Sequence, residues 1–154
     1  ILHKHKIADS MSNALNVLQD KLTDSEYTAL FQLLLTDRGP EFGKPIQFEV
    51  NTDTGEIRGK IFYCDAQQSS QKPHVENNHN FVRDILPNGQ GWNHLTQDKV
   101  DLMFSHINST PRKSLGGKTP YEIFAFLYGK DIADKLNIQK INKDEVNTTP
   151  RLLK

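Results

Sequence analysis

The chain has 154 residues, which is enough for one compact domain and too few for two of ordinary size. Hydrophobic residues make up 36% of the chain and charged residues 25%, which is typical of a soluble globular protein. Lysine plus arginine and aspartate plus glutamate number 19 each, so there is no global positive charge of the kind found in proteins that coat DNA. An enzyme that acts on DNA stays compatible with this balance, because basic groups around an acidic metal site cancel in the total.

The single cysteine, Cys64, excludes an internal disulfide and any zinc site built from several cysteines of one chain. Together with the lack of a signal peptide, it predicts a reducing, cytoplasmic setting. No apolar run approaches the roughly 18 residues of a membrane span. The sequence starts at Ile1, without an initiator methionine, and enters a helical pattern almost at once. We therefore expect that residues upstream of Ile1 are missing.

The first predicted element is a helix after Asp9 with one buried face. Its apolar residues recur at helical spacing and are Met11, Leu15, Leu18 and Leu22. Thr23 and Glu26 have the spacing of a capping box and predict a second helix. Residues 29–35 indicate the end of that helix and a strand buried on both faces, which stops at residues 36–40.

Residues 46–63 are rich in β-forming side chains on either side of a turn at residues 53–55. This composition predicts a hairpin with strands 47–50 and 57–63.

A polar loop, residues 65–72, precedes a predicted helix that starts at Pro73, a residue suited to a first helical turn. The helix runs to about Leu86 and stops at residues 87–89. At 100° per residue, one side of this helix is polar and the opposite side apolar, as in any amphipathic surface helix. The polar side carries Glu76, His79, Asn80, Arg83 and Asp84, and the apolar side carries Val75, Phe81, Val82, Ile85 and Leu86.

The next predicted helix is capped by Thr96. Its buried stripe is predicted to be Val100, Met103, Phe104 and Ile107. A capping box at Thr119 opens another helix, which ends at Gly129, and residues 131–136 form one more short helix. From about Asn137 the tail is polar, and we expect it to be poorly ordered or extended.

Asp37 and Glu76 are the candidate metal ligands. Asp37 stands at the end of a predicted strand, at the sheet edge where α/β proteins place ligands, and Glu76 lies on a later helix. Hard cations such as Mg²⁺ or Mn²⁺ prefer carboxylate oxygens. Two such metals can activate the attacking oxygen and stabilise the leaving oxygen in phosphoryl transfer. The spacing of two acidic residues is not specific by itself, because such residues are common.

Three longer strings are more specific: LLLTDRGPEF, IFYCDAQQSSQKPHVENNHNFVRDILPNG and LTQDKVDLMFSHINSTPRKSLGGKTPYE. In this order and spacing they resemble the second half of transposases of the insertion sequence 30 family, over residues 7–153. The resemblance implies an α/β fold: the ribonuclease-H-like core of integrase-type (DDE) enzymes, a mixed sheet flanked by helices. It also implies DNA strand cleavage and strand transfer at transposon ends, with Mg²⁺ or Mn²⁺, in the bacterial cytoplasm.

Carried over residue by residue, Asp37 matches the second catalytic aspartate of that family and Glu76 its catalytic glutamate, so both would bind metal. Arg83 matches the basic residue two helical turns after the glutamate, which the resemblance implies holds DNA near the scissile phosphate. The further candidate DNA contacts are Lys72, Asn77, Asn78, Asn80, Arg38, Arg112 and Lys118. The segment 108–122 is a family hallmark, and a turn that only packs helices together explains it equally well.

The chain departs from the family pattern in two ways. Arg38 stands where the family usually has asparagine, and a guanidinium beside Asp37 would weaken metal binding or contact DNA. The first catalytic aspartate and the first three strands are expected before the matching region, and neither Asp9 nor Asp20 has a strand context. We therefore expect residues 1–128 to be a partial catalytic core that is inactive alone and oligomeric, marginally folded or rearranged. Residues 129–154 would be a C-terminal helical extension and tail.

Two other interpretations of the sequence differ in their chemistry. His74 and Glu76 match the H-x-E pattern of zinc deaminases, but that chemistry needs a paired cysteine motif, and His79 is five positions from His74 rather than four. A noncatalytic fragment that binds DNA, or assembles with intact transposase subunits, is the stronger alternative. Its phosphate contacts would be Lys72, Arg83, Arg112, Lys113 and Lys118, and its binding weak and nearly independent of sequence.

Overall fold

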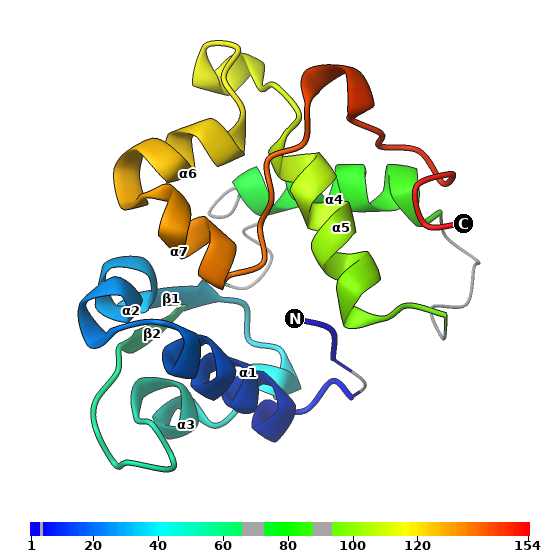
Figure 1. Cartoon of the computed structure of the whole chain (residues 1–154). Coiled ribbons are helices and arrows are strands. Elements are labelled where there is room, and N and C mark those ends of the chain that lie inside the picture. Colours follow the sequence, from blue (N-terminus) through cyan, green and yellow to red (C-terminus); the bar gives the residue numbers. More distant parts are fainter. Residues whose placement is uncertain (4, 66–72, 88–93) are drawn as a thin grey trace. The chain divides into compact units, whose positions relative to one another are not determined.

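The computed structural model describes residues 1–3, 5–65, 73–87 and 94–154, with the backbone alone for residues 73–77 (Figure 1). The chain divides into two compact units. Residues 3–71 form the N-terminal unit, and residues 72–154 with Ile1 and Leu2 form the C-terminal unit. The observed class is α/β, as predicted, with one two-stranded sheet in the part of the chain that is described. The division at residue 128 stays a prediction.

The N-terminal unit is a two-stranded parallel sheet with helices. Its elements are α1 (Ala8–Lys21), α2 (Asp24–Phe31), β1 (Leu33–Thr36), the 3₁₀ turn η1 (Pro40–Phe42), α3 (Pro45–Glu49) and β2 (Lys60–Tyr63). The predicted capping box is confirmed, since the Thr23 hydroxyl accepts a hydrogen bond from the Glu26 amide and the Glu26 carboxylate accepts one from the Thr23 amide. The first two helices therefore begin and end close to where the sequence places them.

The predicted hairpin of residues 47–50 and 57–63 is wrong. Residues 45–49 form α3, which begins at a proline, and within the described residues the two halves share only one antiparallel bridge, Val50 with Ile57. Strand β2 pairs instead with β1, from Leu33 opposite Lys60 to Thr36 opposite Tyr63. A four-residue ladder gives β2 more backbone hydrogen bonds than the turn at Gly55 offers.

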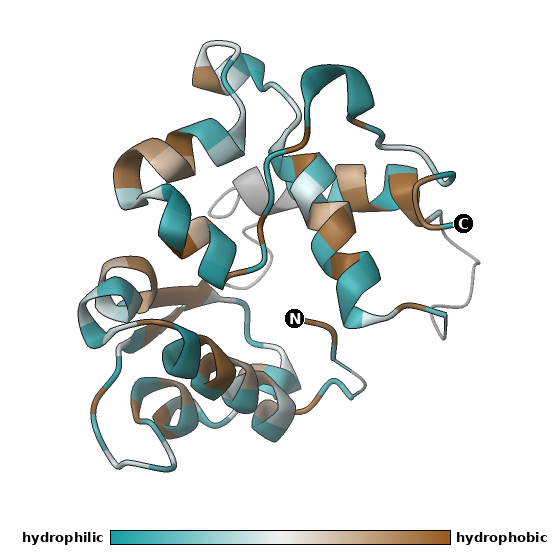
Figure 2. Ribbon diagram, in the orientation of Figure 1, coloured by the Kyte–Doolittle hydropathy of each residue, from teal (hydrophilic) through white to brown (hydrophobic). Residues whose placement is uncertain are grey.

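Described residues cover one face of the sheet, and the apolar side chains on the other face are exposed among them. Leu15 of α1, Phe48 of α3 and Ile61 of β2 are buried together as the core of this unit. On the opposite face, the exposed fractions are 57% for Leu33 and 45% for Leu35. The prediction of a strand buried on both faces is therefore wrong for these residues, although Figure 2 shows β1 as a hydrophobic ribbon.

Arg58 connects helices α1 and α3 through hydrogen bonds. It is 5% exposed, and Nε donates a hydrogen bond to the Phe48 carbonyl at 3.3 Å. The other guanidinium nitrogens donate to the Gln47 carbonyl, to the Ser12 carbonyl and to the Asn16 side-chain oxygen. Burial lowers the pKa of Arg58 from its ordinary value, yet an arginine stays protonated at neutral pH. One guanidinium thus connects α1 and α3 immediately before β2 starts.

We predict that Arg58→Met destabilises the N-terminal unit by about 2 kcal/mol, because it leaves buried carbonyls of α1 and α3 without a donor. The measurement is hydrogen–deuterium exchange of the amides in both helices. Arg38→Met, which removes an exposed arginine of the same unit, is the control and should leave exchange unchanged. Equal protection in Arg58→Met and the unaltered protein would contradict the assigned role.

The regular secondary structure in the described residues of the C-terminal unit is helical. Its elements are α4 (Pro73–Ile85), α5 (Gln97–Asn108), the 3₁₀ turn η3 (Lys113–Leu115), α6 (Pro120–Tyr128), α7 (Lys130–Lys135) and the 3₁₀ turn η4 (Lys143–Glu145). Ile85, Met103 and Ile107 form the core between α4 and α5. The predicted caps at Thr96 and Thr119 are confirmed. Phe104 is 37% exposed, so its place in the buried stripe of α5 was predicted wrongly.

The C-terminal tail is extended and packs on α5. The Ser105 and Ser109 hydroxyls accept hydrogen bonds from the backbone amides of Gln139 and Ile141, at 3.0 and 2.9 Å. Leu153 is buried in the core of this unit. Of the two expectations for the tail, the structure therefore agrees with an extended segment.

His106 is the titratable group in this attachment. Its Nδ1 accepts a hydrogen bond from the Asn147 amide at 3.1 Å, so this nitrogen carries no proton. Burial lowers the pKa of His106 below 6.5, and the Glu145 carboxylate acts in the opposite direction. When the pH falls, the unfolded state takes up the proton first. The stabilisation of the folded tail by neutral His106 is therefore fully present above about pH 6.5, and it is lost as the pH falls through the pKa of His106 in the folded protein.

We predict that lowering the pH from about 7.5 to about 5 loosens the tail, because a protonated Nδ1 cannot accept from Asn147. Hydrogen exchange of the Gln139, Ile141 and Asn147 amides, corrected for the intrinsic effect of pH, measures the change. In His106→Asn the amide oxygen replaces Nδ1 as an acceptor that does not titrate, so this variant should lose the pH dependence. Retention of that dependence would show that another group is responsible.

Candidate functional site

The string TDRGPEF forms a tight turn at the end of β1. Asp37 directly follows the last residue of the strand, and its side chain is exposed. Its Oδ1 accepts a hydrogen bond from the Gly39 amide at 3.1 Å, which is the local pattern of an Asx turn. The turn presents Asp37, one of the two predicted catalytic carboxylates, at the carboxyl end of a parallel strand.

In this string the Glu41 carboxylate occupies the space that a side chain at position 39 would need, so its position requires Gly39. A Cβ atom on Gly39 would lie 2.5 Å from Oε2 of Glu41, which excludes any side chain there unless the carboxylate moves. Glu41 is 7% exposed, and its Oε1 forms an ion pair with Lys6 Nζ at 3.0 Å. Pro40 begins η1 with a backbone angle suited to a first turn. These three residues therefore shape the turn that carries Asp37.

Asp65 lies at the same end of the sheet as Asp37. The pairing of Thr36 with Tyr63 aligns the carboxyl ends of β1 and β2, and Asp65 comes two residues after β2. Asp65 was not among the predicted site residues. The signal was present, because in both LLLTD and IFYCD an apolar run is followed by an aspartate.

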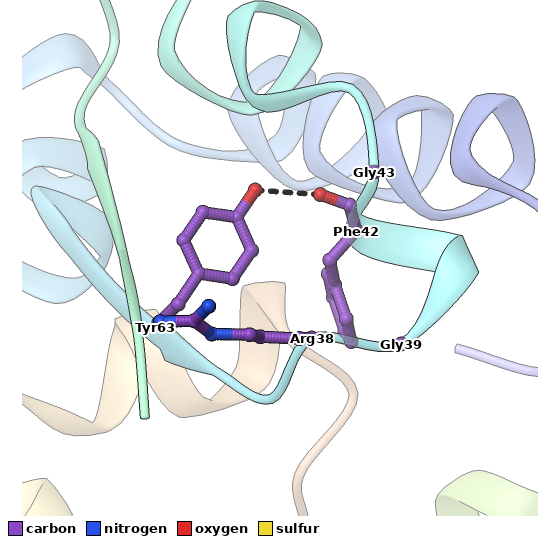
Figure 3. Close-up of a pocket in the computed structure, with 5 residues that line it drawn as sticks. All are labelled: Arg38, Gly39, Phe42, Gly43 and Tyr63. Carbon is purple, nitrogen blue, oxygen red and sulfur yellow. Dashed lines mark hydrogen bonds between the residues drawn. The ribbon is translucent and has the colours of Figure 1, made fainter. Parts of the chain in front are cut away.

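A hollow of about 410 Å³ opens beside this end of the sheet. It is lined by Arg38, Gly39, Phe42, Gly43 and Tyr63, as Figure 3 shows. The Tyr63 hydroxyl donates a hydrogen bond to the Phe42 carbonyl at 2.6 Å. Arg38 was predicted to contact DNA, whereas nothing in the sequence pattern singled out the two aromatic residues.

The helix that carries Glu76 is amphipathic as predicted. Asn80 and Arg83 are exposed, and Ile85 is buried in the core of the unit. Glu76 lies near the start of α4, but its side chain and that of Asn77 are outside the described part of the structure, as is the whole of Lys72.

The Arg112 side chain contacts other residues of the C-terminal unit. Its Cζ lies 3.8 Å above the centre of the Phe81 ring, within the range of a cation–π contact. A terminal nitrogen donates to the Asn78 side-chain oxygen and to the Ile107 carbonyl, both at 3.4 Å. Burial lowers the pKa of Arg112. This guanidinium thus connects the loop after α5 to the helix of Glu76, and the packing interpretation of the hallmark segment gains support.

Lys118 closes that loop through its backbone and leaves its side chain exposed. Its carbonyl accepts from the Arg112 amide at 3.0 Å, and its own amide donates to Leu115. Gly116 and Gly117 have φ angles of 63° and 82°, a left-handed conformation that side chains other than glycine rarely adopt. The backbone conformation of the turn therefore explains why glycine stands at both positions, without any contact to a ligand.

Within the described side chains, no group of three or more histidine, cysteine, aspartate or glutamate residues is placed to hold a metal ion. This range includes His79 and Cys64 but not the side chains of His74 and Glu76. Nor does any helix in the described ranges have the length and apolar character needed to cross a bilayer.

The sequence is similar to transposases. Transposase InsI of insertion sequence element IS30A from Escherichia coli (strain K12) is 34% identical over 90 residues, which are 58% of this chain and 22% of that protein. The putative integrase ORF3 of Spiroplasma virus SpV1-R8A2 B is 30% identical over 91 residues, 59% of this chain and 27% of its own length. The transposase of IS1086 from Cupriavidus metallidurans is 27% identical over 110 residues, 71% of this chain and 31% of its length. No protein-family model and no solved structure matches the chain.

These relatives define a class, the transposases and integrases. Within that class, the resemblance to transposases of the insertion sequence 30 family is confirmed, since the copies IS30A, IS30C and IS30D all match at 34% identity. The chain spans about a fifth of the length of these InsI proteins.

We predict that Arg112→Met costs the C-terminal unit about 1 kcal/mol, because α4 loses the cation–π contact and the hydrogen bond to Asn78. Hydrogen exchange of the α4 amides should accelerate. Lys113→Met, an exposed neighbour in the same turn, is the control and should have no effect. Unchanged exchange combined with weaker DNA binding would instead make Arg112 a phosphate contact.

Proposed function

We propose that this chain supplies two metal-binding carboxylates, Asp37 and Glu76, of a transposase that cuts DNA strands and joins them at transposon ends. The observation that carries the proposal is the exposed carboxylate of Asp37 at the carboxyl end of a parallel strand, within a string that resembles this family. The confirmed similarity to transposases supports it. The fold proposed for the complete protein is the ribonuclease-H-like core of integrase-type enzymes.

The donor atoms fit Mg²⁺ or Mn²⁺. Both ions prefer oxygen ligands, and carboxylates at a sheet edge can hold them while waters fill the remaining positions. When bound, the metal would activate the attacking oxygen and stabilise the charge on the leaving one. The protein's part is to keep Asp37 fixed, which the hydrogen bond from the Gly39 amide and the packing of Glu41 achieve.

The DNA contacts proposed for this chain are of two kinds. Arg83 and Asn80 are exposed on the helix of Glu76, where a guanidinium and an amide can hold the backbone near the scissile phosphate. Arg38 and Lys118 are exposed in loops and would add phosphate contacts. The proposed partners are transposon ends and target DNA, and the proposed setting is the bacterial cytoplasm.

A third carboxylate is needed to complete a DDE site, and we propose that it comes from outside residues 1–154. Leu33, Leu35 and Phe62 are exposed on one face of the sheet, and a further part of the complete protein packed on that face would cover this apolar surface. Such a surface otherwise favours association with another copy of the chain. The 154 residues alone should therefore be oligomeric and almost inactive.

The test is metal-dependent nicking of supercoiled plasmid by this chain and by a longer protein that adds an upstream strand with an aspartate. We predict nicking by the longer protein only. In it, Asp37→Asn or Glu76→Gln should lower the rate at least about a hundredfold, since losing a direct ligand exceeds the 10- to 100-fold cost of losing an outer partner.

Asp84→Asn is the matched control for this test, because it neutralises an exposed carboxylate of the same helix and should leave the rate unchanged. Nicking by the chain alone at a comparable rate would refute the proposal that its site is incomplete. An unaffected rate in Asp37→Asn would refute the metal role.

A noncatalytic role in DNA binding or subunit assembly is the second candidate. The exposed apolar face of the sheet and the exposed basic side chains favour it. Glu76→Gln discriminates between the two functions. It should abolish cleavage if the site is catalytic, and it should leave DNA affinity unchanged or higher if the chain only binds.

A further inference from the structure

The hollow beside Asp37 has rigid aromatic walls. In Figure 3 the Tyr63 ring and the Phe42 ring lie on opposite sides of it, and the Arg38 side chain runs along a third side. The hydrogen bond from the Tyr63 hydroxyl to the Phe42 carbonyl links the two walls. Phe42 also contacts Phe48 of the core, with ring centroids 5.6 Å apart. Both rings are therefore held before any ligand arrives.

Two glycines line part of the hollow, and the packing around each leaves little room for a side chain. A Cβ atom on Gly43 would lie 3.2 Å from the Pro40 carbonyl, and one on Gly39 would collide with Glu41. Only backbone atoms line these parts of the wall. The volume of about 410 Å³ falls within the range of roughly 300 to 1,000 Å³ of small-molecule sites.

Arg38 gives the hollow a positive charge. Its side chain is exposed, and it has no hydrogen bond or ion pair within the residues that the structure describes. Its acidic neighbour Glu41 pairs with Lys6. A guanidinium next to ring faces suits a ligand that combines a phosphate with a flat heterocycle, because it binds phosphate in a forked geometry while the rings stack on the heterocycle.

We propose that the hollow binds one unpaired nucleotide of DNA, with its base against Phe42 and Tyr63 and its phosphate on Arg38. The choice of DNA rests on the proposed function. A base within a duplex has its faces covered by its neighbours, so only an unstacked nucleotide can use these rings. Because Arg38 directly follows Asp37, the strand held here would pass the proposed metal ligand.

The probe is a short single-stranded deoxyoligonucleotide with one 2-aminopurine, titrated into the whole chain in the presence of a metal chelator. Stacking on the rings should quench the fluorescence. Arg38→Met should weaken binding about tenfold and lower the salt dependence by about one phosphate contact. Phe42→Leu keeps an apolar group in the core but should reduce the quenching, with an affinity loss of about fivefold or more.

Two controls separate these effects from general damage. Arg151→Met removes an exposed arginine of the other unit and should leave affinity and quenching unchanged. The α1 amides should remain protected from hydrogen exchange in Arg38→Met and Phe42→Leu, which shows that the unit is folded. A duplex of the same sequence should bind with little quenching.

The proposal is overturned if folded Arg38→Met and Phe42→Leu bind and quench like the unaltered chain. It is also overturned if inorganic phosphate at millimolar concentration displaces the oligonucleotide while a deoxynucleoside has no effect, because the hollow is then an anion site only. Failure of the proposed function looks different. In that case the longer protein, with its upstream strand, and its Glu76→Gln variant are equally inactive in nicking, while Arg38-dependent quenching persists.

Discussion

A buried guanidinium holds the candidate site in place. Arg58 lies between α1 and α3 and donates hydrogen bonds to carbonyls of both helices, immediately before β2 begins. Strand β2 then pairs in parallel with β1, and the ladder ends with Thr36 opposite Tyr63. Because parallel strands bring their carboxyl ends to one edge, everything proposed for Asp37 depends on this pairing.

That edge combines three kinds of chemistry within a few residues. Asp37 offers carboxylate oxygens, Arg38 offers a guanidinium, and Phe42 and Tyr63 offer ring faces. The parts come from one short turn and one strand, so a small unit can assemble them. The proposed metal binding and the proposed nucleotide binding would use different atoms, so a substitution can affect one without the other.

The sequence predicted local structure well wherever the deciding contact is local. The capping boxes at Thr23 and Thr119 join residues three apart, and both helices begin where these boxes place them. The prediction was wrong wherever a distant partner decides. Residues 57–63 look like half of a hairpin, yet β2 pairs with β1, about 27 positions away, because Ile61 is buried there with Leu15. No window of neighbouring residues contains that information.

The order and spacing of residues were enough to predict the family resemblance, the amphipathic helix of Glu76 and the candidate Asp37. The roles of the charged side chains depend instead on contacts that the fold creates. Arg112 and Arg38 are both arginines in polar loops, but Arg112 stacks on Phe81 whereas Arg38 borders an open hollow. The physical reason is that a guanidinium can stack on a ring or bind a phosphate equally well. Which of these it does depends on the groups that the fold brings within reach.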